Sequence, residues 1–237
     1  MMRLLPFGDR ALVLNFEQRI SPAIHQQVSH WLQKIEQANL VGIQYCLPAY
    51  CSITIVYDPL LTHFEKLSQA IQNLEAPTSA KENKGISWRI PVCYEADFAP
   101  DLDNLNRQTG LSTAEIIRYH TTPIYDIYMM GFLPGFAYMG ILPPALYCKR
   151  KAQPRLEVPA GAVALAAQQT GIYPSKGPGG WQWIGQTPVS LLLSHSDRPF
   201  LFQAGDRVQF HPISKREYKV LAAQIRLPHF DVQALYA

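Results

Sequence analysis

The chain has little charge, no long apolar run and no paired cysteine motif. Charged residues make up 16% of its 237 positions, and the net charge of +3 comes from scattered basic residues, which argues against a nucleic-acid binder and favours small-molecule or protein partners. No apolar stretch approaches the roughly 20 residues that span a bilayer. The N-terminus MMRLLPFGDR also lacks the features of a signal peptide. We therefore expect a cytoplasmic protein that does not contact a membrane.

The cysteines and histidines show no metal-ligand spacing. The four cysteines contain no C-x-x-C pair and lie mostly in apolar runs, which predicts buried free thiols. The seven histidines form neither H-E-x-x-H nor a cysteine-histidine ligand pattern. We expect no structural metal.

The first 75 residues alternate between strand-like and helix-like patterns. Two short apolar runs joined at Gly8-Asp9 predict a hairpin, and Ser21 before Pro22 predicts the start of an amphipathic helix. The order β-β-α-β-β-α predicts a small α+β domain with one antiparallel sheet and both helices on one face. The expected strands are 3–7, 11–16, 42–47 and 52–57, and the expected helices are 21–35 and 64–74.

The segment 76–85, APTSAKENKG, is polar and rich in turn-forming residues, as is typical of a linker between two cores. We therefore predict an N-terminal domain at 1–80 and a second domain at 86–237.

The second domain begins with a strand-like run, SWRIPVCY, and a helical region at 101–120, in which Ser112 and Glu115 have the spacing of a capping box. Short apolar runs separated by glycine and proline follow, and such closely spaced strands predict a β-barrel. These runs are YDIYMMGF, AGAVALAA, WQWIG, VSLLL, RPFLF and RVQFHP. Residues 221–236 fit either a helix or an extended segment.

Three segments are rich in glycine and proline: 131–140, 158–163 and 169–181. The first and the third also contain aromatic residues. Glycine lets backbone N–H groups approach a ligand closely, and proline limits the entropy lost on binding. Such loops suit a carboxylate or phosphate, although no Walker A motif is present. Tight turns at barrel corners explain the same composition equally well.

Few side chains suggest catalysis by themselves. His120 ends a predicted helix, where the helix dipole favours a cationic histidine, and this position fits capping or surface placement as well as acid–base chemistry. Lys176 and Arg155 are close enough in sequence to the glycine-rich segments to pair with an anion, but each also fits a solvated charge. The run 149–151 fits an exposed loop, and no serine triad is evident.

The motifs GFLPGFAYMG (131–140), PRLEVPAGAVALA (154–166) and QTGIYPSKGPGGWQWIGQTP (169–188) resemble those of the 5-oxoprolinase B-subunit family, also known as the KipI or allophanate-hydrolase subunit 1 family. The resemblance continues in order through most of the chain, from GDRAL (8–12) to GDRV (205–208). It implies an α+β domain joined to a cyclophilin-like β-barrel.

The resemblance also implies a function. Members act with homologues of the A and C subunits of 5-oxoprolinase, the latter also called KipA or allophanate-hydrolase subunit 2. Together they couple ATP hydrolysis, with Mg possible, to the opening of 5-oxoproline to glutamate. The catalytic residues that the resemblance implies are His120, Gln169 and Lys176. The substrate- or nucleotide-binding residues that it implies are Gly131, Phe132, Pro134, Gly135, Phe136, Tyr138, Arg155, Pro159, Gly161, Thr170, Gly171, Tyr173, Pro178, Gly179, Gly180 and Trp181.

The chain departs from the family pattern at a few positions. Ala162 replaces the usual serine, Ala167 replaces a glycine, and 149–151 reads Lys-Arg-Lys where Pro-Arg is usual. The first change excludes a role for that serine hydroxyl. Two other functions remain open: a KipI-type inhibitor of a sensor histidine kinase, and a carboxyltransferase component that acts on urea or amide substrates.

Overall fold

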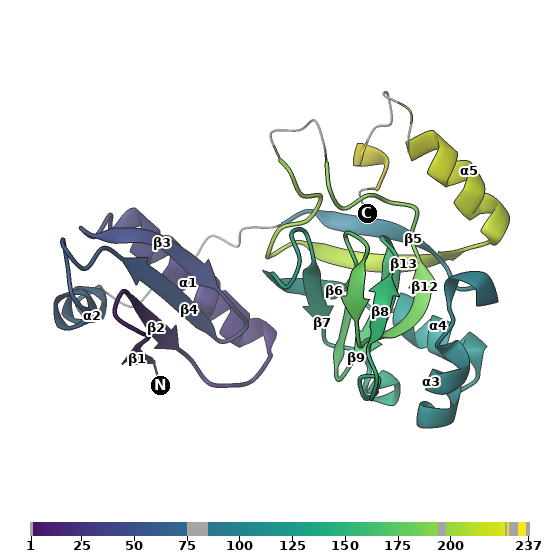
Figure 1. Cartoon of the computed structure of the whole chain (residues 1–237), viewed down its shortest axis with the longest axis horizontal. Helices are drawn as coiled ribbons and strands as arrows, with labels where there is room; N and C mark the ends of the chain where they lie inside the picture. Colours follow the sequence, from purple (N-terminus) through teal and green to yellow (C-terminus); the bar gives the residue numbers. More distant parts are fainter. Residues whose placement is uncertain (1, 75–84, 194–197, 226, 228–231, 236–237) are drawn as a thin grey trace. The chain divides into compact units, whose positions relative to one another are not determined.

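The computed structural model describes residues 2–74, 85–193, 198–225, 227 and 232–235. The chain divides into two compact units, Met1–Asn83 and Lys84–Ala237, each with a hydrophobic core of its own (Figure 1). The linker predicted at 76–85 lies almost entirely outside the described residues.

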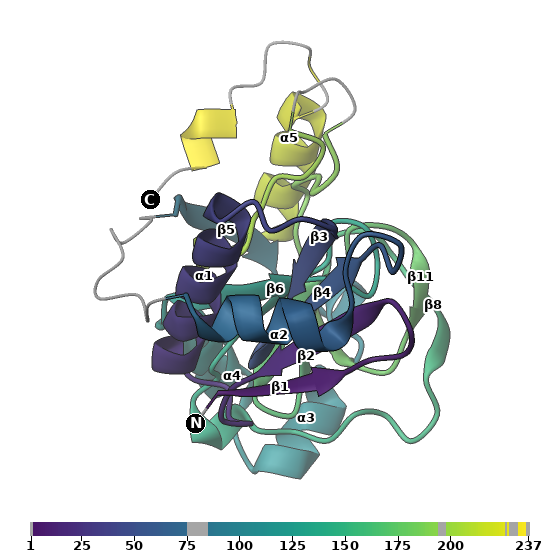
Figure 2. The same ribbon diagram turned by 90° about the vertical axis from the view of Figure 1, so that its left-hand side faces the viewer.

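The N-terminal unit is a four-stranded antiparallel sheet with two helices, as the α+β pattern predicts (Figure 2). The strand order is β1-β2-β4-β3. The elements are β1 (Arg3–Pro6), β2 (Ala11–Asn15), α1 (Pro22–Gln37), β3 (Ile43–Pro48), β4 (Ser52–Tyr57) and α2 (Phe64–Gln72).

Local sequence signals explain these elements. The Ser21 hydroxyl accepts a hydrogen bond from the Ile24 amide at 3.3 Å and caps α1, where Pro22 is the first helical residue. Strand β4 alternates strictly between buried and half-exposed side chains, and its buried Ile53 and Ile55 pack with apolar residues of both helices in one cluster. The two helices therefore cover the same face of the sheet.

The second unit is a closed seven-stranded barrel with strand order β10-β7-β6-β13-β5-β12-β9, in which β13 runs parallel to β5. The strands are β5 (Ser87–Cys93), β6 (Tyr125–Met130), β7 (Ala137–Gly140), β9 (Ala162–Ala166), β10 (Gln169–Ile172), β12 (Gln182–Gln186) and β13 (Arg207–Ile213). Strands β8 (Arg155–Val158) and β11 (Gly177–Gly179) form a separate two-stranded ribbon. The predicted barrel is confirmed.

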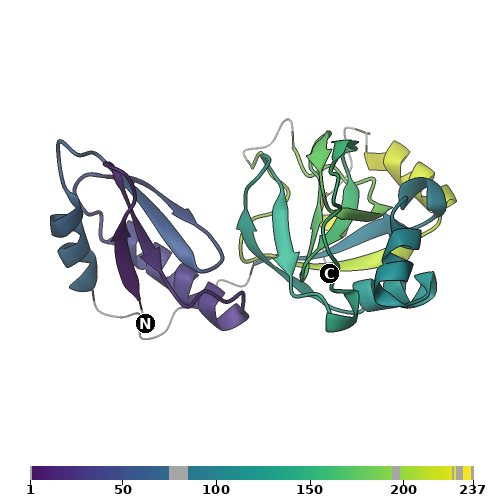
Figure 3. The same cartoon turned by 60° about the horizontal axis from the view of Figure 1, so that its bottom comes forward.

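The barrel unit also has three helices (Figure 3): α3 (Leu102–Thr109), α4 (Thr113–Thr121) and α5 (Lys215–Ile225). Helices α3 and α4 contact each other, whereas α5 packs against β5. The single helical region predicted at 101–120 is two helices, because Gly110 ends α3 with φ 74° and Ser112 begins α4 with the predicted capping box. Short 3₁₀ turns occur at η1 (Ala96–Phe98), η2 (Pro144–Leu146) and η3 (Val232–Leu235). No helix within the described ranges has the length and apolarity to cross a membrane.

Two predicted strands are wrong. The runs VSLLL and RPFLF form only an isolated bridge between Leu192 and Phe200. Both runs include buried residues, Leu191, Leu201 and Phe202 among them, so an apolar pattern here reflects burial of irregular chain against the core and not strand pairing.

Strand β9 is buried on both faces. Val163 and Leu165 belong to the main barrel core, whereas Ala162, Ala164 and Ala166 belong to a second cluster. Small alanine side chains let aromatic side chains from other segments pack closely over this outer surface of the barrel. The second cluster is where the candidate site lies.

Candidate functional site

The three glycine-rich segments meet around four aromatic side chains, Phe136, Tyr138, Tyr173 and Trp181, which we call the aromatic cluster. The ring of Phe136 lies 4.8 Å from Tyr138, 5.4 Å from Tyr173 and 5.6 Å from Trp181 between centroids, in edge-to-face arrangements. Val158 and Ala162 of the second segment pack with these aromatic side chains. The fold thus brings together three segments that are separate in the sequence.

Several glycines of these segments serve close packing. A side chain at Gly179 would overlap the Tyr173 hydroxyl, and one at Gly171 would press on the Phe136 ring at 3.0 Å. Gly161 has φ 80° and would overlap the Thr187 carbonyl. For these positions the interpretation as tight turns and close contacts accounts for the glycine.

The segment around Gly179 does not form an open cradle for phosphate. Residues 177–179 are strand β11, which pairs with β8 so that Gly177 faces Val158 and Gly179 faces Arg155. The Lys176 ammonium lies 2.7 Å from the Glu157 carboxylate, and both side chains are exposed. In this arrangement the Lys176 ammonium and the backbone of Gly177 and Gly179 have partners within the chain.

The loop at 131–136 also uses its own hydrogen bonds. The amides of Gly131, Leu133 and Phe136 donate to carbonyls within the loop at 2.9–3.0 Å. Phe132 has φ 68° and its side chain is 60% exposed. This loop therefore presents an aromatic side chain, and not a row of free donors, to the outside.

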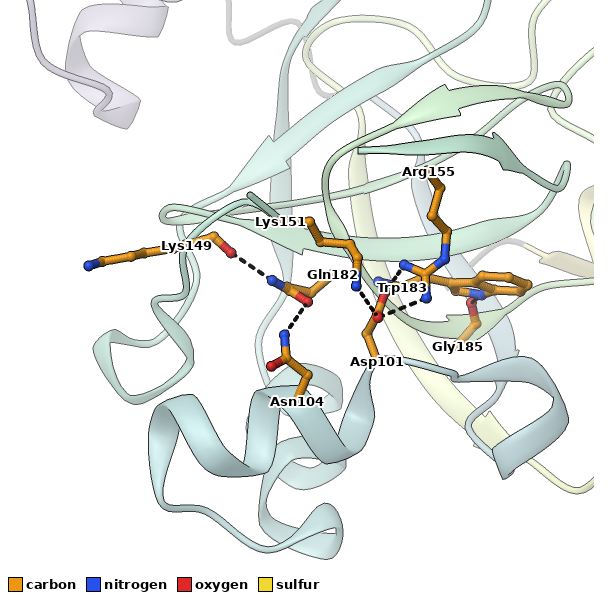
Figure 4. Close-up of polar contacts among 8 residues, drawn as sticks. All are labelled: Asp101, Asn104, Lys149, Lys151, Arg155, Gln182, Trp183 and Gly185. Atoms are coloured by element: carbon orange, nitrogen blue, oxygen red, sulfur yellow. Dashed lines mark hydrogen bonds and ion pairs between the residues drawn. The ribbon is translucent and has the colours of Figure 1, made fainter. Parts of the chain in front are cut away.

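Asp101 is the centre of a polar network (Figure 4) that includes the amide of Trp183, whose ring packs against the aromatic cluster. Arg155 donates to both oxygens of this buried carboxylate, at 2.6 and 2.9 Å, and Lys151 and the Trp183 amide donate at 2.8 Å. Burial alone would raise the pKa of Asp101, but these hydrogen bonds outweigh it and lower the pKa. Arg155 is thus held by Asp101 and does not fit the predicted role of binding an incoming anion.

The network extends across neighbouring segments. Gln182 donates to the Lys149 carbonyl at 2.8 Å and accepts from Asn104 at 3.0 Å, which connects α3, β12 and the segment before β8. Sequence reasoning did not assign a role to Asp101, Lys151 or Gln182. The available signal was Asp101 itself, an acidic residue at the start of the helical region predicted at 101–120.

His120 lies in the barrel core and is fully buried. Its Nδ1 is 2.7 Å from the Tyr94 hydroxyl, its Nε2 is 2.9 Å from the Thr170 hydroxyl, and its ring stacks on Phe210 at 4.5 Å. Burial lowers the pKa of His120 to about 3, so the ring is neutral at neutral pH. The cationic histidine expected at this helix end is not what the structure shows, and the geometry favours a structural role.

The three predicted catalytic residues lie in different environments. His120 is inside the barrel, Gln169 is half-buried at the start of β10, and Lys176 is exposed before β11. Thr170 supports His120 and is not open to a ligand. Among the predicted binding residues, Phe132, Pro134 and Pro178 are exposed, and the rest are half-buried or buried. The half-buried ones are Gly131, Tyr138, Arg155, Pro159 and Gly180.

The two alanines that differ from the family pattern lie in different environments. Ala162 is buried in the second cluster, whereas Ala167 is exposed and has φ 52°, a left-handed conformation that favours glycine. The glycine usual at this position is therefore explained by the backbone. Within the part of the chain that the structure describes, no three His, Cys, Asp or Glu side chains form a potential metal site.

The chain is similar to known proteins over most of its length. It matches the family of the carboxyltransferase domain, subdomain C and D, over residues 2–202. It is 35% identical to the 5-oxoprolinase B subunit of Bacillus subtilis (strain 168) over 224 residues, which is 89% of this chain and 92% of that protein.

Solved structures show the same fold. The crystal structure of TTHA0988 has 32% sequence identity and a TM-score of 0.76, and the match covers 87% of this chain and 40% of that one. The urea amidolyase of Kluyveromyces lactis has 17% identity and a TM-score of 0.78, with 94% of this chain and 15% of that one covered. In both, the region similar to this chain is part of a longer polypeptide.

Proposed function

The chain belongs to the family of the carboxyltransferase domain, subdomain C and D, that includes the 5-oxoprolinase B subunit, and from this premise we propose that it is the B subunit of an ATP-dependent 5-oxoprolinase complex. The observation that carries the proposal is the 35% identity to proteins of that name in three bacteria, over 86–89% of this chain. All three family motifs lie within the matched residues 2–202, and their segments meet at the aromatic cluster.

The proposed complex needs partner chains, which we identify as homologues of the A and C subunits of 5-oxoprolinase. The predicted catalytic residues differ in burial, from His120 in the barrel core to the exposed Lys176, and we expect partner chains to complete the site. The related region in TTHA0988 is 40% of a longer chain, which is consistent with a unit that works beside further polypeptide.

We assign ATP to the partner chains. The glycine-rich segment at 177–180 is largely a paired strand, and its neighbour Lys176 is held by Glu157. The residues of this chain that we expect to face a partner or substrate are the exposed ones of the same segments. Phe132 is 60% exposed and Leu156 of β8 is 94% exposed, so each offers apolar surface for burial.

The reaction adds water across the amide bond of 5-oxoproline to give glutamate. An amide carbonyl is a poor electrophile, so the developing oxyanion needs positioned donors or cations. In this chain the cations at 149–151 adjoin the motif segments, and Lys151 donates a hydrogen bond to Asp101. Arg150 makes no ion pair among the described residues. Burial raises the pKa of both Tyr138 and Tyr173, and Arg150 lies close enough for its charge to oppose that rise. We expect Arg150 to contribute to charge stabilisation at a subunit interface.

A second candidate is a carboxyltransferase component that acts on a urea or amide substrate. The family description and the fold of urea amidolyase favour it. Such an activity would require a carboxylated biotin carrier and bicarbonate-derived carboxyl groups, whereas 5-oxoproline hydrolysis requires neither.

The test is reconstitution of the complex from this chain and its A- and C-subunit homologues, with each component omitted in turn. We expect glutamate and phosphate release from 5-oxoproline and ATP only when all three are present. The Arg150→Met complex should lose at least tenfold in rate, and the Lys219→Met complex, altered on exposed α5, should keep the full rate. Activity without this chain, or carboxylation of urea with a biotin carrier and no 5-oxoproline hydrolysis, would refute the proposal.

A further inference from the structure

A hollow of about 630 Å³ opens on the barrel unit, and none of its lining residues is one that the sequence assigned to the site. It lies between the end of α3, the segment that follows η2 and the turn that joins β9 to β10. Its lining residues are Gln108, Tyr147, Cys148, Lys149, Ala167 and Gln168.

Hydrogen bonds fix the backbone that forms its walls. The Lys149 amide donates to the Gln108 side-chain oxygen at 3.2 Å, and the Lys149 carbonyl accepts from Gln182 at 2.8 Å. Cys148 and Ala167 exchange backbone hydrogen bonds at 3.3 and 2.8 Å. The hollow is therefore held in place by the same network that contains Asp101, and little ordering is needed for a ligand to bind.

The turn at 167–168 carries backbone strain. Ala167 has φ 52°, a left-handed conformation that is unfavourable for alanine. The Gln168 carbonyl accepts from the Leu142 amide at 2.9 Å and holds the turn in this conformation. Strained residues of this kind cluster at ligand sites, and this one lines the hollow.

The chemistry of the lining suits a small acid. Lys149 has no ion-pair partner among the described residues, and Figure 4 shows its side chain extending away from the Asp101 group. None of the six lining residues is acidic, and the two glutamines can each donate and accept hydrogen bonds. Tyr147, Cys148 and Ala167 add apolar surface that a compact ring would cover.

We propose that this hollow binds a small carboxylate that also carries an amide, of the 5-oxoproline class. The Lys149 ammonium pairs with the carboxylate, and the Gln108 and Gln168 carboxamides pair with the amide N–H and carbonyl. The identity of the acid rests on the proposed function, whereas the preference for a carboxylate rests on the lining residues alone.

The test titrates 5-oxoproline into the isotope-labelled chain and follows backbone amide signals by NMR. We expect shifts at Cys148, Lys149, Ala167 and Gln168, and a roughly tenfold weaker affinity for Lys149→Met, the loss expected for a hydrogen bond to a charged group. Lys219→Met on α5 is the matched control and should bind as the unmodified chain does. The primary amide of 5-oxoproline, which lacks the carboxylate, should bind the unmodified chain and Lys149→Met equally weakly.

Shifts located elsewhere, no shifts at all, or equal affinity of 5-oxoproline for Lys149→Met and the unmodified chain would overturn the proposal. A reconstituted complex that hydrolyses 5-oxoproline with an unchanged KM when it carries Lys149→Met would overturn the site while leaving the proposed function intact. Conversely, localised binding by a chain whose complete complex shows no 5-oxoproline hydrolysis would support the site and refute the function.

Discussion

Among the described residues, the N-terminal unit buries the polar side chains of Thr62 and Ser68, whereas the barrel unit buries those of Asp101, His120, Thr170, Gln182, Thr187 and Asp206. The first core consists of apolar side chains packed between two helices and one face of a sheet. The second core contains a carboxylate held by two cations and a neutral histidine held by two hydroxyls.

The two units therefore depend on different forces. Apolar burial is non-directional and tolerates changes that keep volume, whereas a buried charge needs each of its partners in place. The contrast is sharper because the N-terminal sheet buries only one of its faces. On the other face, Tyr45 and Leu47 are each 53% exposed. We expect the loss of a buried polar side chain to lower the unfolding free energy of the barrel unit. A change in the volume of a buried apolar side chain should lower the unfolding free energy of either unit.

The largest expected effect is that of Asp101→Ala. Removing the carboxylate leaves Arg155 and Lys151 partly buried without their partner and leaves the Trp183 amide without its acceptor. We expect the barrel unit to lose about 4 kcal/mol of unfolding free energy. Urea unfolding in a Trp31→Phe background measures it, because the other tryptophans, at 88, 181 and 183, all lie in the barrel unit.

The control for Asp101→Ala is Glu17→Gln, which breaks the exposed pair with Arg19 at 3.3 Å in the N-terminal unit. We expect it to cost less than about 0.5 kcal/mol. Equal losses for the two substitutions would contradict the view that burial sets the value of these ion pairs.

The next effect is that of Ile55→Ala in the N-terminal unit. Ile55 is fully buried among apolar residues of both helices, so the cavity and the lost apolar contacts should cost about 3 kcal/mol. Hydrogen exchange, resolved by residue, should show the loss in 2–74 and unchanged protection in the barrel strands. Equal loss in both units would show that they unfold as one, contrary to their separate cores.

The separation of cores also explains what the sequence could predict. Period-two patterns and a capping serine determine the elements of the N-terminal unit locally, and all six appear in the predicted order. The barrel was predictable as a class, but VSLLL and RPFLF were misassigned because burial and strand pairing produce the same apolar runs. The break at Gly110 depends on one glycine that a helical pattern tolerates.

The candidate site was less predictable for the same physical reason. The motif segments were found from glycine, proline and aromatic content, yet Asp101, Lys151 and Arg155 are linked only in space. His120 could not be distinguished from a surface residue because its partners, Tyr94 and Thr170, are 26 and 50 positions away. The hollow beside Lys149 has no sequence motif, and its walls come from three separate segments.

Acid should destabilise the barrel unit more than the N-terminal unit. The pKa of His120 is lowered by burial to about 3, so below its ordinary value of 6.5 the unfolded chain binds a proton that the folded chain does not. The free energy of unfolding should therefore fall by about 1.4 kcal/mol per pH unit as pH decreases from 6.5 towards 3. Asp101, whose pKa is also lowered, adds to this loss below its ordinary value of 3.8.

The comparison in the N-terminal unit is His25, whose pKa is also lowered by burial but whose side chain is only half-buried. Urea unfolding at pH 7, 6 and 5 should give the steeper slope in the barrel unit. His120→Gln should flatten that slope, whatever its cost at pH 7, because glutamine does not titrate. An unchanged slope would show that another group controls the acid response.

The smallest effect compares one substitution, alanine to glycine, in the two units. At Ala167 the φ of 52° strains alanine, so glycine should relieve the strain and, after its greater unfolded-state entropy is counted, stabilise the barrel unit by about 0.5 kcal/mol. At Ala38, the C-cap of α1 with φ −71°, no strain exists and the entropy term alone should destabilise the N-terminal unit by about 0.5 kcal/mol. Urea midpoints of the two variants should therefore move in opposite directions.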